Sequence, residues 1–259
     1  MTGTPGPPIT RTTARSAAAT ASGIARDVVR RGQSRLDRRL FPTLVAGHAP
    51  TARLALTYDD GPTPDLTDVV AETLAAHGHR ATFFVLVPQA EAHPHLVRRL
   101  LDLGHEVGLH GVAHERLPGQ PWSAVHRQLR DGRDRLAAIG ARPTLFRPPY
   151  GAQNRRTYLL ARTAGLRPVA WNADVRDYQE RGPDAVREQL AVSLRPGAVV
   201  LLHDGAGERP GSELTADQRG RRLSILDRTM ALLAERALTS VPVSELSTAG
   251  ALRGAWLSA

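Results

Sequence analysis

The sequence predicts an α/β fold in which about seven parallel strands alternate with helices. The chain has 259 residues, of which 41% are hydrophobic, enough to fill the core of one large domain or two small ones. Runs of apolar and β-branched residues alternate with segments of helical periodicity. Ionisable residues recur where the predicted strands end, which is the functional edge of such sheets. A closed or nearly closed barrel and an open doubly wound sheet both fit this pattern.

Seven segments have the composition of buried strands. The first ends in Asp59-Asp60 before Gly61-Pro62, and glycine and proline stop a strand and turn the chain. The sixth is a continuous apolar run that ends at His203. The predicted strands cover residues 53–59, 81–87, 106–110, 144–147, 167–172, 198–203 and 238–243.

The segments between these strands predict amphipathic helices. In the first of them, Leu66, Val70 and Leu74 fall on one face. Several segments end at a glycine, which is a common C-terminal stop, and one begins with Pro183, where the missing N–H is tolerated. The predicted helices cover residues 65–77, 89–103, 122–139, 154–164, 183–194 and 220–236.

Positive charge is concentrated before the first strand. The formal net charge is +9, every basic residue is arginine, and eight arginines against two aspartates lie in residues 1–46. We expect residues 1–46 to form a disordered and basic helical extension, and residues 47–259 to form the main domain. The helix predicted over residues 17–40 either packs on that domain or makes weak contact with an anionic membrane.

Composition excludes several other classes of protein. The chain has no cysteine, so disulfides and thiolate metal sites are excluded. Aromatic residues make up only 4% of the chain, and the positive charge is concentrated in the extension, so we expect no nucleic-acid partner. We find no export signal and no apolar window of membrane-spanning length, and therefore expect a cytoplasmic location or one peripheral to the inner membrane face.

Two adjacent carboxylates, Asp59 and Asp60, follow the first strand. Neighbouring negative charges repel each other, and the arrangement is reasonable if one carboxylate holds a cation while the other acts as a base. The alternative is a simple turn, because aspartate, glycine and proline are the residues that turns favour.

His110 and His114 lie four residues apart and can face one cation. Together with Asp60 they supply two imidazoles and one carboxylate, a donor set that suits a catalytic zinc ion with open positions. Alternatives are a pair of surface histidines, or the iron site of an oxygenase, which uses the same donors.

Three further motifs follow along the chain. Arg147 precedes Pro148-Pro149 and can fix a carboxylate by paired hydrogen bonds. Acidic side chains and an aromatic ring follow the fifth strand in the segment 171–178. His203 follows a buried strand and can act as an acid or base near neutral pH, although it can equally be a structural residue at a strand end.

In chain order, these five stretches resemble the five motifs of the polysaccharide deacetylase family, the NodB-homology domain of carbohydrate esterase family 4. The resemblance extends from about Arg53 to Leu246. It implies a distorted (β/α) barrel of about seven parallel strands. It also implies a metal-dependent hydrolase, usually a zinc enzyme, that removes an acetyl group from an N-acetylated amino sugar or polysaccharide such as one containing N-acetylglucosamine.

The resemblance also implies roles for individual residues. Three positions depart from the family pattern: Tyr58 replaces the commoner phenylalanine, Gly111 replaces serine or threonine, and Tyr178 replaces tryptophan. By position, the resemblance assigns Asp59 as base, His203 as acid, Arg147 and Asp177 as the residues that orient or tune them, Asp60, His110 and His114 as metal ligands, and Tyr150, Asp174, Tyr178 and Leu201 to the substrate pocket.

Two other functions remain open from the sequence. The same fold can hydrolyse another non-peptide C–N bond, such as that of a cyclic amide or imide, or deacetylate a lipid-linked sugar or a small glycosylated metabolite. A basic binding protein is the other alternative, and only the charge of the extension supports it.

Overall fold

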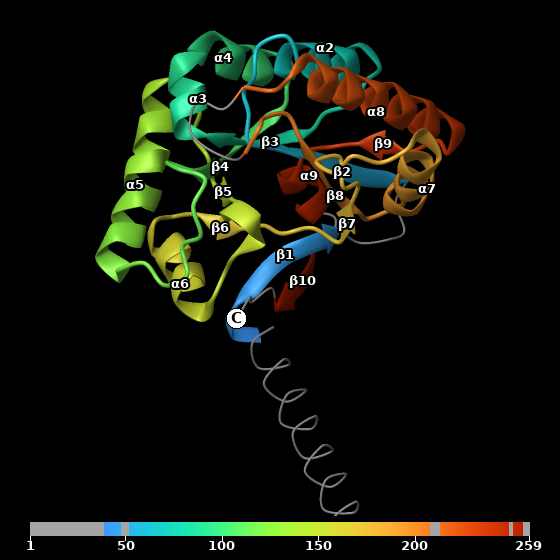
Figure 1. Ribbon diagram of the computed structural model, residues 1–259. Helices are drawn as coiled ribbons and strands as arrows, with labels where there is room; N and C mark the ends of the chain where they lie inside the picture. Colours follow the sequence, from blue (N-terminus) through green and yellow to red (C-terminus); the bar gives the residue numbers. More distant parts are fainter. Residues whose placement is uncertain (1–38, 48–51, 208–212, 249–250, 256–259) are drawn as a thin grey trace, which may run out of the picture.

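A curved parallel sheet forms the centre of the molecule (Figure 1). The computed structural model describes residues 39–47, 52–207, 213–248 and 251–255. The strands of this sheet are β2 (Arg53–Asp59), β3 (Thr82–Leu86), β4 (Glu106–Gly111), β5 (Leu145–Phe146), β6 (Arg167–Pro168), β7 (Ala173–Asp174), β8 (Val199–His203) and β9 (Thr239–Ser240). The order is β6-β5-β4-β3-β2-β8-β7, with β9 paired to the start of β2, and every pair is parallel. The predicted distorted barrel of about seven parallel strands is confirmed, with seven strands in the main order and β9 paired beside them.

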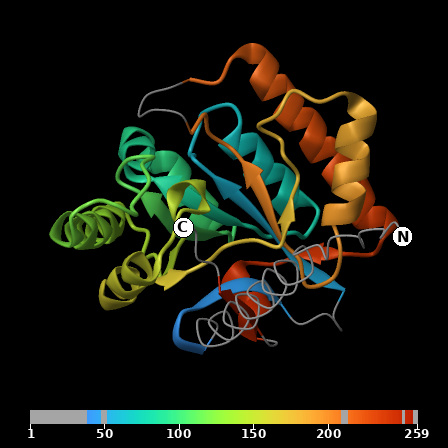
Figure 2. The same cartoon turned by 60° about the horizontal axis from the view of Figure 1, so that its bottom comes forward.

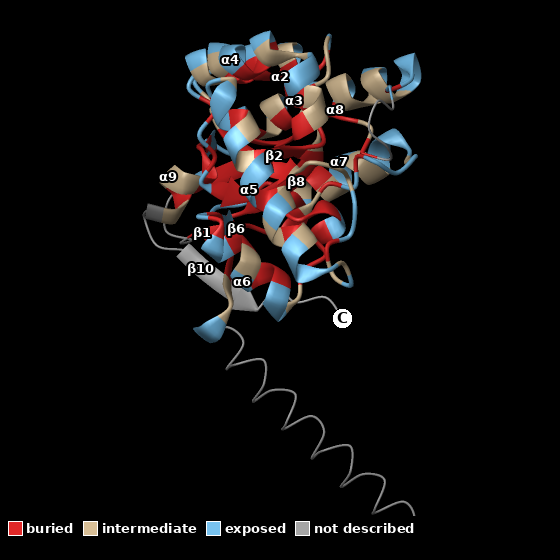
Figure 3. Ribbon diagram, turned by 90° about the vertical axis from the view of Figure 1, so that its left-hand side faces the viewer, coloured by how far each residue is buried: buried red, intermediate tan, exposed pale blue. Residues whose placement is uncertain are grey.

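Most of the helices cover the outer side of the sheet (Figures 1 and 2), whereas the short helix Val243–Thr248 packs on its inner side through Val243 and Leu246. Their inward faces are buried and their outward faces exposed (Figure 3). None of the helices in the described part of the chain combines the length and apolar character needed to cross a membrane. The helices are α2 (Thr67–Ala76), α3 (Val87–Ala92), α4 (Pro94–Asp102), α5 (Trp122–Ala138), α6 (Arg155–Thr163), α7 (Pro183–Ser193), α8 (Ala216–Glu235) and α9 (Val243–Thr248).

Two helices differ from the sequence prediction. The pattern predicts one helix over residues 89–103, but the structure has α3 and α4, because Pro94 lacks the N–H that a continuous helix would need and instead begins the second helix. The pattern also places the start of α8 at residue 220. The helix starts earlier because the Thr215 side chain accepts from the Gln218 N–H, and Gln218 bonds back to the Thr215 N–H.

A strand that the sequence pattern does not predict lies across the seam of the barrel. The edge strands β6 and β7 do not pair with each other in the described residues. β1 (Pro42–Gly47) lies across this side of the barrel. Leu44 pairs with Val169, which follows β6, and Ala46 pairs with Ala198, which precedes β8. β1 also pairs antiparallel with β10 (Ala251–Ala255). Residues 42–46, expected in the extension, therefore lie against the barrel.

The rest of the expected extension falls mainly outside the described residues. Residues 1–38, which include the predicted disordered segment and most of the predicted basic helix, are not among them, whereas residues 39–40 are helical. The predicted role of this helix at a membrane is therefore untested.

Alternation along the strands separates two apolar cores. In β2, Leu54 and Leu56 belong to the larger core beneath the helices, whereas Ala55 belongs to the smaller core inside the barrel. Because successive side chains of a strand point to opposite faces, Asp59 follows Ala55 on the inner face. The same alternation in β8 places His203 on the face of Val199. Asp59 and His203, at the ends of two neighbouring strands, therefore both lie on the inner face of the sheet.

Candidate active site

A pocket of about 440 Å³ opens at the C-terminal ends of the strands. Most of the site residues predicted from the sequence line it, and the two exceptions, Arg147 and Asp177, are buried behind it and bonded to residues that do. The predicted residues that line the pocket are Asp59, Asp60, His110, His114, Tyr150, Asp174, Tyr178, Leu201 and His203.

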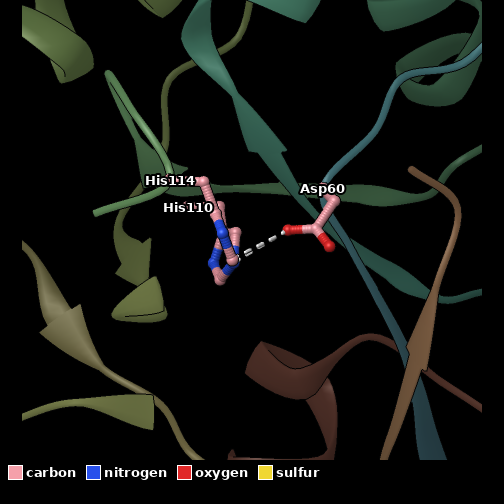
Figure 4. A group of neighbouring side chains, drawn as sticks. All are labelled: Asp60, His110 and His114. Atoms are coloured by element: carbon pink, nitrogen blue, oxygen red, sulfur yellow. Dashed lines mark ion pairs between the residues drawn. The ribbon is translucent and has the colours of Figure 1, made fainter. Parts of the chain in front are cut away.

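Asp60, His110 and His114 form one cluster in this pocket (Figure 4). Asp60 Oδ1 lies 3.2 Å from His110 Nε2 and 3.4 Å from His114 Nε2. One nitrogen or oxygen atom from each residue lies within 4.8 Å of those of the other two. Asp60 takes a positive φ of 80°, a conformation that costs energy in a residue other than glycine and is typical of functional sites.

This cluster fits a metal ion. Asp60 Oδ1 is buried and has no hydrogen-bond partner among the described residues. His110 Nδ1 donates to the Arg147 carbonyl at 2.8 Å, because a carbonyl can only accept, and this leaves the lone pair of Nε2 facing Asp60. A histidine that bonds through one nitrogen and offers the other, beside a second histidine and a carboxylate, is a typical arrangement of metal ligands.

The electrostatics of the cluster favour a positive charge. Burial lowers the pKa of His110, but Asp59 and Asp60 outweigh burial and raise it. Burial raises the pKa of Asp60, but the histidines, His110 first, outweigh burial and hold that pKa below its usual range. The same negative field that raises the pKa of His110 attracts a cation to the three side chains.

Arg147 fixes Asp59 beside this cluster. Its guanidinium is fully buried and donates through Nη1 to Asp59 Oδ1 at 2.8 Å and to Thr57 Oγ1 at 2.7 Å. Nη2 donates to the Ala170 carbonyl, and the guanidinium lies over the Phe84 ring at 4.3 Å from its centroid. Only Oδ1 of Asp59 bonds to Arg147, so Oδ2 is left for chemistry in the pocket, 3.9 Å from His110 Nε2.

His203 and Asp177 form a second polar pair across the pocket. His203 Nδ1 contacts Asp177 Oδ1 at 2.7 Å, and the His203 backbone N–H donates to Asp177 Oδ2 at 2.8 Å. Burial opposes a charge on His203, but Asp177 outweighs it and raises the pKa to about 9. Since His203 is the register partner of Asp59 in the β2–β8 pair, its imidazole and the Asp59 carboxylate line the same pocket.

The predicted substrate walls also lie at this pocket. The Tyr150 ring packs against His114 with centroids 4.3 Å apart, and the Tyr178 ring meets His203 edge-on at 5.5 Å. Asp174 Oδ1 accepts from the Arg176 N–H, and Oδ2 accepts from the Tyr178 hydroxyl at 3.4 Å. Leu201 is the register partner of Asp174 in the β7–β8 pair. Together with Tyr150 and Tyr178 it gives the pocket an aromatic and apolar rim.

The sequence reasoning missed the segment that follows His203. Asp204 is buried and accepts from the Gly61 N–H and the Thr67 hydroxyl, so it holds the turn after Asp60. A Cβ at Gly205 would lie 2.3 Å from the Asp60 carbonyl carbon, and one at Gly207 would lie 2.3 Å from Asp60 Oδ2. The Asp-Gly-Ala-Gly sequence signals a turn, but not its close approach to Asp60.

Gly111 departs from the family pattern for a local reason. Its φ is +143°, and a Cβ there would lie 2.9 Å from the Ala113 carbonyl oxygen. A serine or threonine at this position would therefore be strained in this backbone.

Comparisons with known proteins agree with this geometry. A family model described as polysaccharide deacetylase matches residues 46–169. The chain is 36% identical over 183 residues to the chitooligosaccharide deacetylase of Sinorhizobium fredii, covering 70% of this chain and 85% of that protein. It is 37% identical over 177 residues to the peptidoglycan-N-acetylglucosamine deacetylase PgdA of Listeria monocytogenes, covering 66% of this chain and 37% of that protein.

A solved structure supports the same assignment. The Bc1960 peptidoglycan N-acetylglucosamine deacetylase matches with a TM-score of 0.68 and 27% identity, covering 78% of this chain and 91% of that one. The sequence match covers 85% of the Sinorhizobium fredii relative, and the barrel is shared with the solved structure. The five motifs also gather at one rim. The chain therefore belongs to the polysaccharide deacetylase family.

Proposed function

We propose that the protein is a metal-dependent deacetylase that hydrolyses the acetamide of an N-acetylated amino sugar, with zinc as its metal. One observation carries the proposal: the Asp60–His110–His114 cluster shares a single pocket with Asp59 and His203. The curated relatives, named as deacetylases of chitooligosaccharides and of peptidoglycan N-acetylglucosamine, support the substrate class.

The residues of the pocket divide the reaction between them. When bound, zinc supplies Lewis acidity, which makes water a stronger nucleophile and an amide carbonyl a better electrophile. Asp59, oriented by Arg147, accepts the proton of the attacking water. His203 contacts Asp177 through Nδ1 and delivers a proton to the leaving nitrogen from Nε2, because an amine leaves only after protonation.

The walls of the pocket position the acyl group and the sugar. Leu201 offers an apolar surface for the acetyl methyl group, and the exposed rings of Tyr150 and Tyr178 offer faces for a sugar. The family resemblance assigns a backbone N–H near Tyr150 as the donor to the oxyanion, a contact that would strengthen as charge develops.

Acetate release from N-acetylglucosamine oligomers tests the proposal. Zinc-loaded protein should release acetate, a chelator should stop the release, and restored zinc should recover it. Asp59→Asn should keep the bound zinc but lose turnover by about 10²–10⁴-fold, the range for a general base. Zinc-loaded wild-type protein that leaves a panel of N-acetylated sugars unchanged would contradict the proposed substrate class.

A further inference from the structure

Arg116 lies at the rim of the active-site pocket on the side of the metal cluster. Its guanidinium carbon is 4.9 Å from the centroid of the Tyr150 ring, and that ring packs on His114. The Arg116 side chain is exposed. The Tyr150 ring, which is tilted by 53° against His114, therefore separates a solvent-facing cation from a residue of the metal cluster.

The charge of Arg116 has no counterpart within the described residues. No carboxylate there forms an ion pair with it, and its guanidinium lies over the Tyr150 ring. The acidic groups of the pocket are engaged elsewhere: Asp59 with Arg147, Asp60 with the two histidines, and Asp174 with the Tyr178 hydroxyl and a backbone N–H. Arg116 is therefore a surplus cation at the mouth of the pocket.

The other arginine of the pocket wall, Arg222, provides a contrast. Its Nη1 donates to the Gly205 carbonyl, and its charge adds to that of His203, the larger contributor, in holding the pKa of the buried Asp177 below its usual range. Arg222 thus stabilises the segment that follows His203, and its presence is explained within the protein. Nothing comparable explains Arg116.

We propose that Arg116 selects an N-acetylated amino sugar that carries an anionic group, a phosphate or a carboxylate, beside the acetamide-bearing ring. A neutral glycan has no group that needs a cation at this position. A guanidinium stacked on an aromatic face keeps its edge N–H groups available for paired hydrogen bonds to an oxyanion. The inference rests on the proposed deacetylase function and narrows its substrate class.

Matched substrates test this selectivity. Acetate release is measured with a neutral N-acetylglucosamine disaccharide, the same disaccharide bearing a phosphate, and the same disaccharide bearing a carboxylate. Wild-type protein should have a KM about tenfold lower for at least one anionic form, as expected for a hydrogen-bonded charge pair, and the arm with the lower KM identifies the anion. Added salt should reduce this preference, because the site is exposed.

Arg116 variants assign the preference to this side chain. Arg116→Gln should raise KM for the anionic substrate about tenfold, with kcat unchanged and the neutral substrate unaffected. Arg116→Lys should restore part of the difference, because it keeps the charge without the planar fork. Arg98→Gln is the matched control, since Arg98 is an exposed arginine of α4 that does not line the pocket, and it should leave the preference intact.

Equal KM values of wild-type protein for neutral and anionic substrates would overturn the proposal. So would an Arg116→Gln variant in which KM rises equally for the neutral and the anionic substrate. Binding separates this inference from the proposed function. Calorimetric titration of zinc-loaded Asp59→Asn with the same disaccharides should show about tenfold tighter binding of the anionic form. Equal dissociation constants would refute the role of Arg116, whatever the outcome of the acetate assay.

Discussion

Arg147 holds two parts of the site in place at once. Its side chain fixes Asp59, and its backbone carbonyl accepts from His110 Nδ1. Only the side-chain role follows from the sequence. The family resemblance implies it, and Pro148 and Pro149 hold the arginine before them in a rigid segment. The carbonyl role depends on the parallel pairing of β4 and β5, which the local sequence does not encode.

Replacing Arg147 should separate these two roles. In Arg147→Lys the carbonyl still accepts from His110. The planar fork is lost, in which Nη1 reaches Asp59 and Nη2 reaches the Ala170 carbonyl. We expect kcat to fall by about 10²-fold while zinc affinity stays near the wild-type value. Steady-state kinetics with metal titration checks this, and a variant that loses zinc binding as strongly as turnover would contradict the division of roles.

The Asp177–His203 pair should set the alkaline limit of activity and of stability. Because the pKa of His203 is raised from 6.5 to about 9, its charged form stabilises the fold fully below pH 6.5. This contribution is lost as the pH rises through about 9. Activity that needs a proton on His203 should fall over the same upper range.

Asp177→Asn tests that assignment. Without the carboxylate, burial dominates, the pKa of His203 falls, and the alkaline limb of the kcat profile should move to lower pH. Tyr178→Phe is the control, because the ring contact with His203 remains and only the hydroxyl bond to Asp174 is lost, so its alkaline limb should stay in place. An unshifted limb in Asp177→Asn would exclude His203 as the acid.

At the scale of elements, the segment after β8 is shaped by contact with Asp60. Gly205→Ala would push a methyl group against the Asp60 backbone, so we expect a lower melting temperature and weaker zinc binding. Gly220→Ala is the matched control: it lies within α8 with no atom within 4 Å of the added carbon, and there alanine should raise helix stability by up to about 1 kcal/mol. Thermal unfolding and zinc titration compare the two variants. Equal melting temperatures and equal zinc affinities would contradict this account.

Elements with strong local signals could be predicted, and those fixed by distant partners could not. β2, α5 and α7 follow from apolar patterning and from glycine or proline signals. β7 is missed because it is only two residues long, and its pairing with β8 rather than local periodicity defines it. α9 replaces the end of the strand predicted over residues 238–243, since β9 ends at Ser240.

At the scale of the whole molecule, β1 closes the barrel seam, and its burial can be measured. Leu44 of β1 is buried in the inner core, whereas Leu40, just before the strand, is 56% exposed. Leu44→Ala should lower the free energy of unfolding by about 2–4 kcal/mol, as for other buried leucines, and Leu40→Ala should change it by less than about 0.5 kcal/mol. Denaturant unfolding measures both changes in free energy. Equal changes would contradict the claim that β1 packs into the barrel and closes it.

The sequence pattern does not predict how the barrel is closed, because the closure depends on pairing between distant segments. Strand–helix alternation is compatible with an open sheet or a barrel, and only the resemblance favoured the barrel. β1 follows an arginine-rich segment and pairs with β10 at the other end of the chain. The grouping of the candidate site residues at one rim follows more readily from the sequence, because these residues lie at strand ends and parallel strands bring their ends together.

Zinc stoichiometry compared with hydrolysis tests the central claim most directly. Elemental analysis of wild-type protein and of His114→Ala, each assayed for acetate release in parallel, measures both quantities at once. We predict one zinc per wild-type chain with activity, and loss of both in His114→Ala, because two ligands remain where three are needed. Undiminished acetate release by zinc-free protein, or by His114→Ala, would contradict a metal centre at Asp60, His110 and His114.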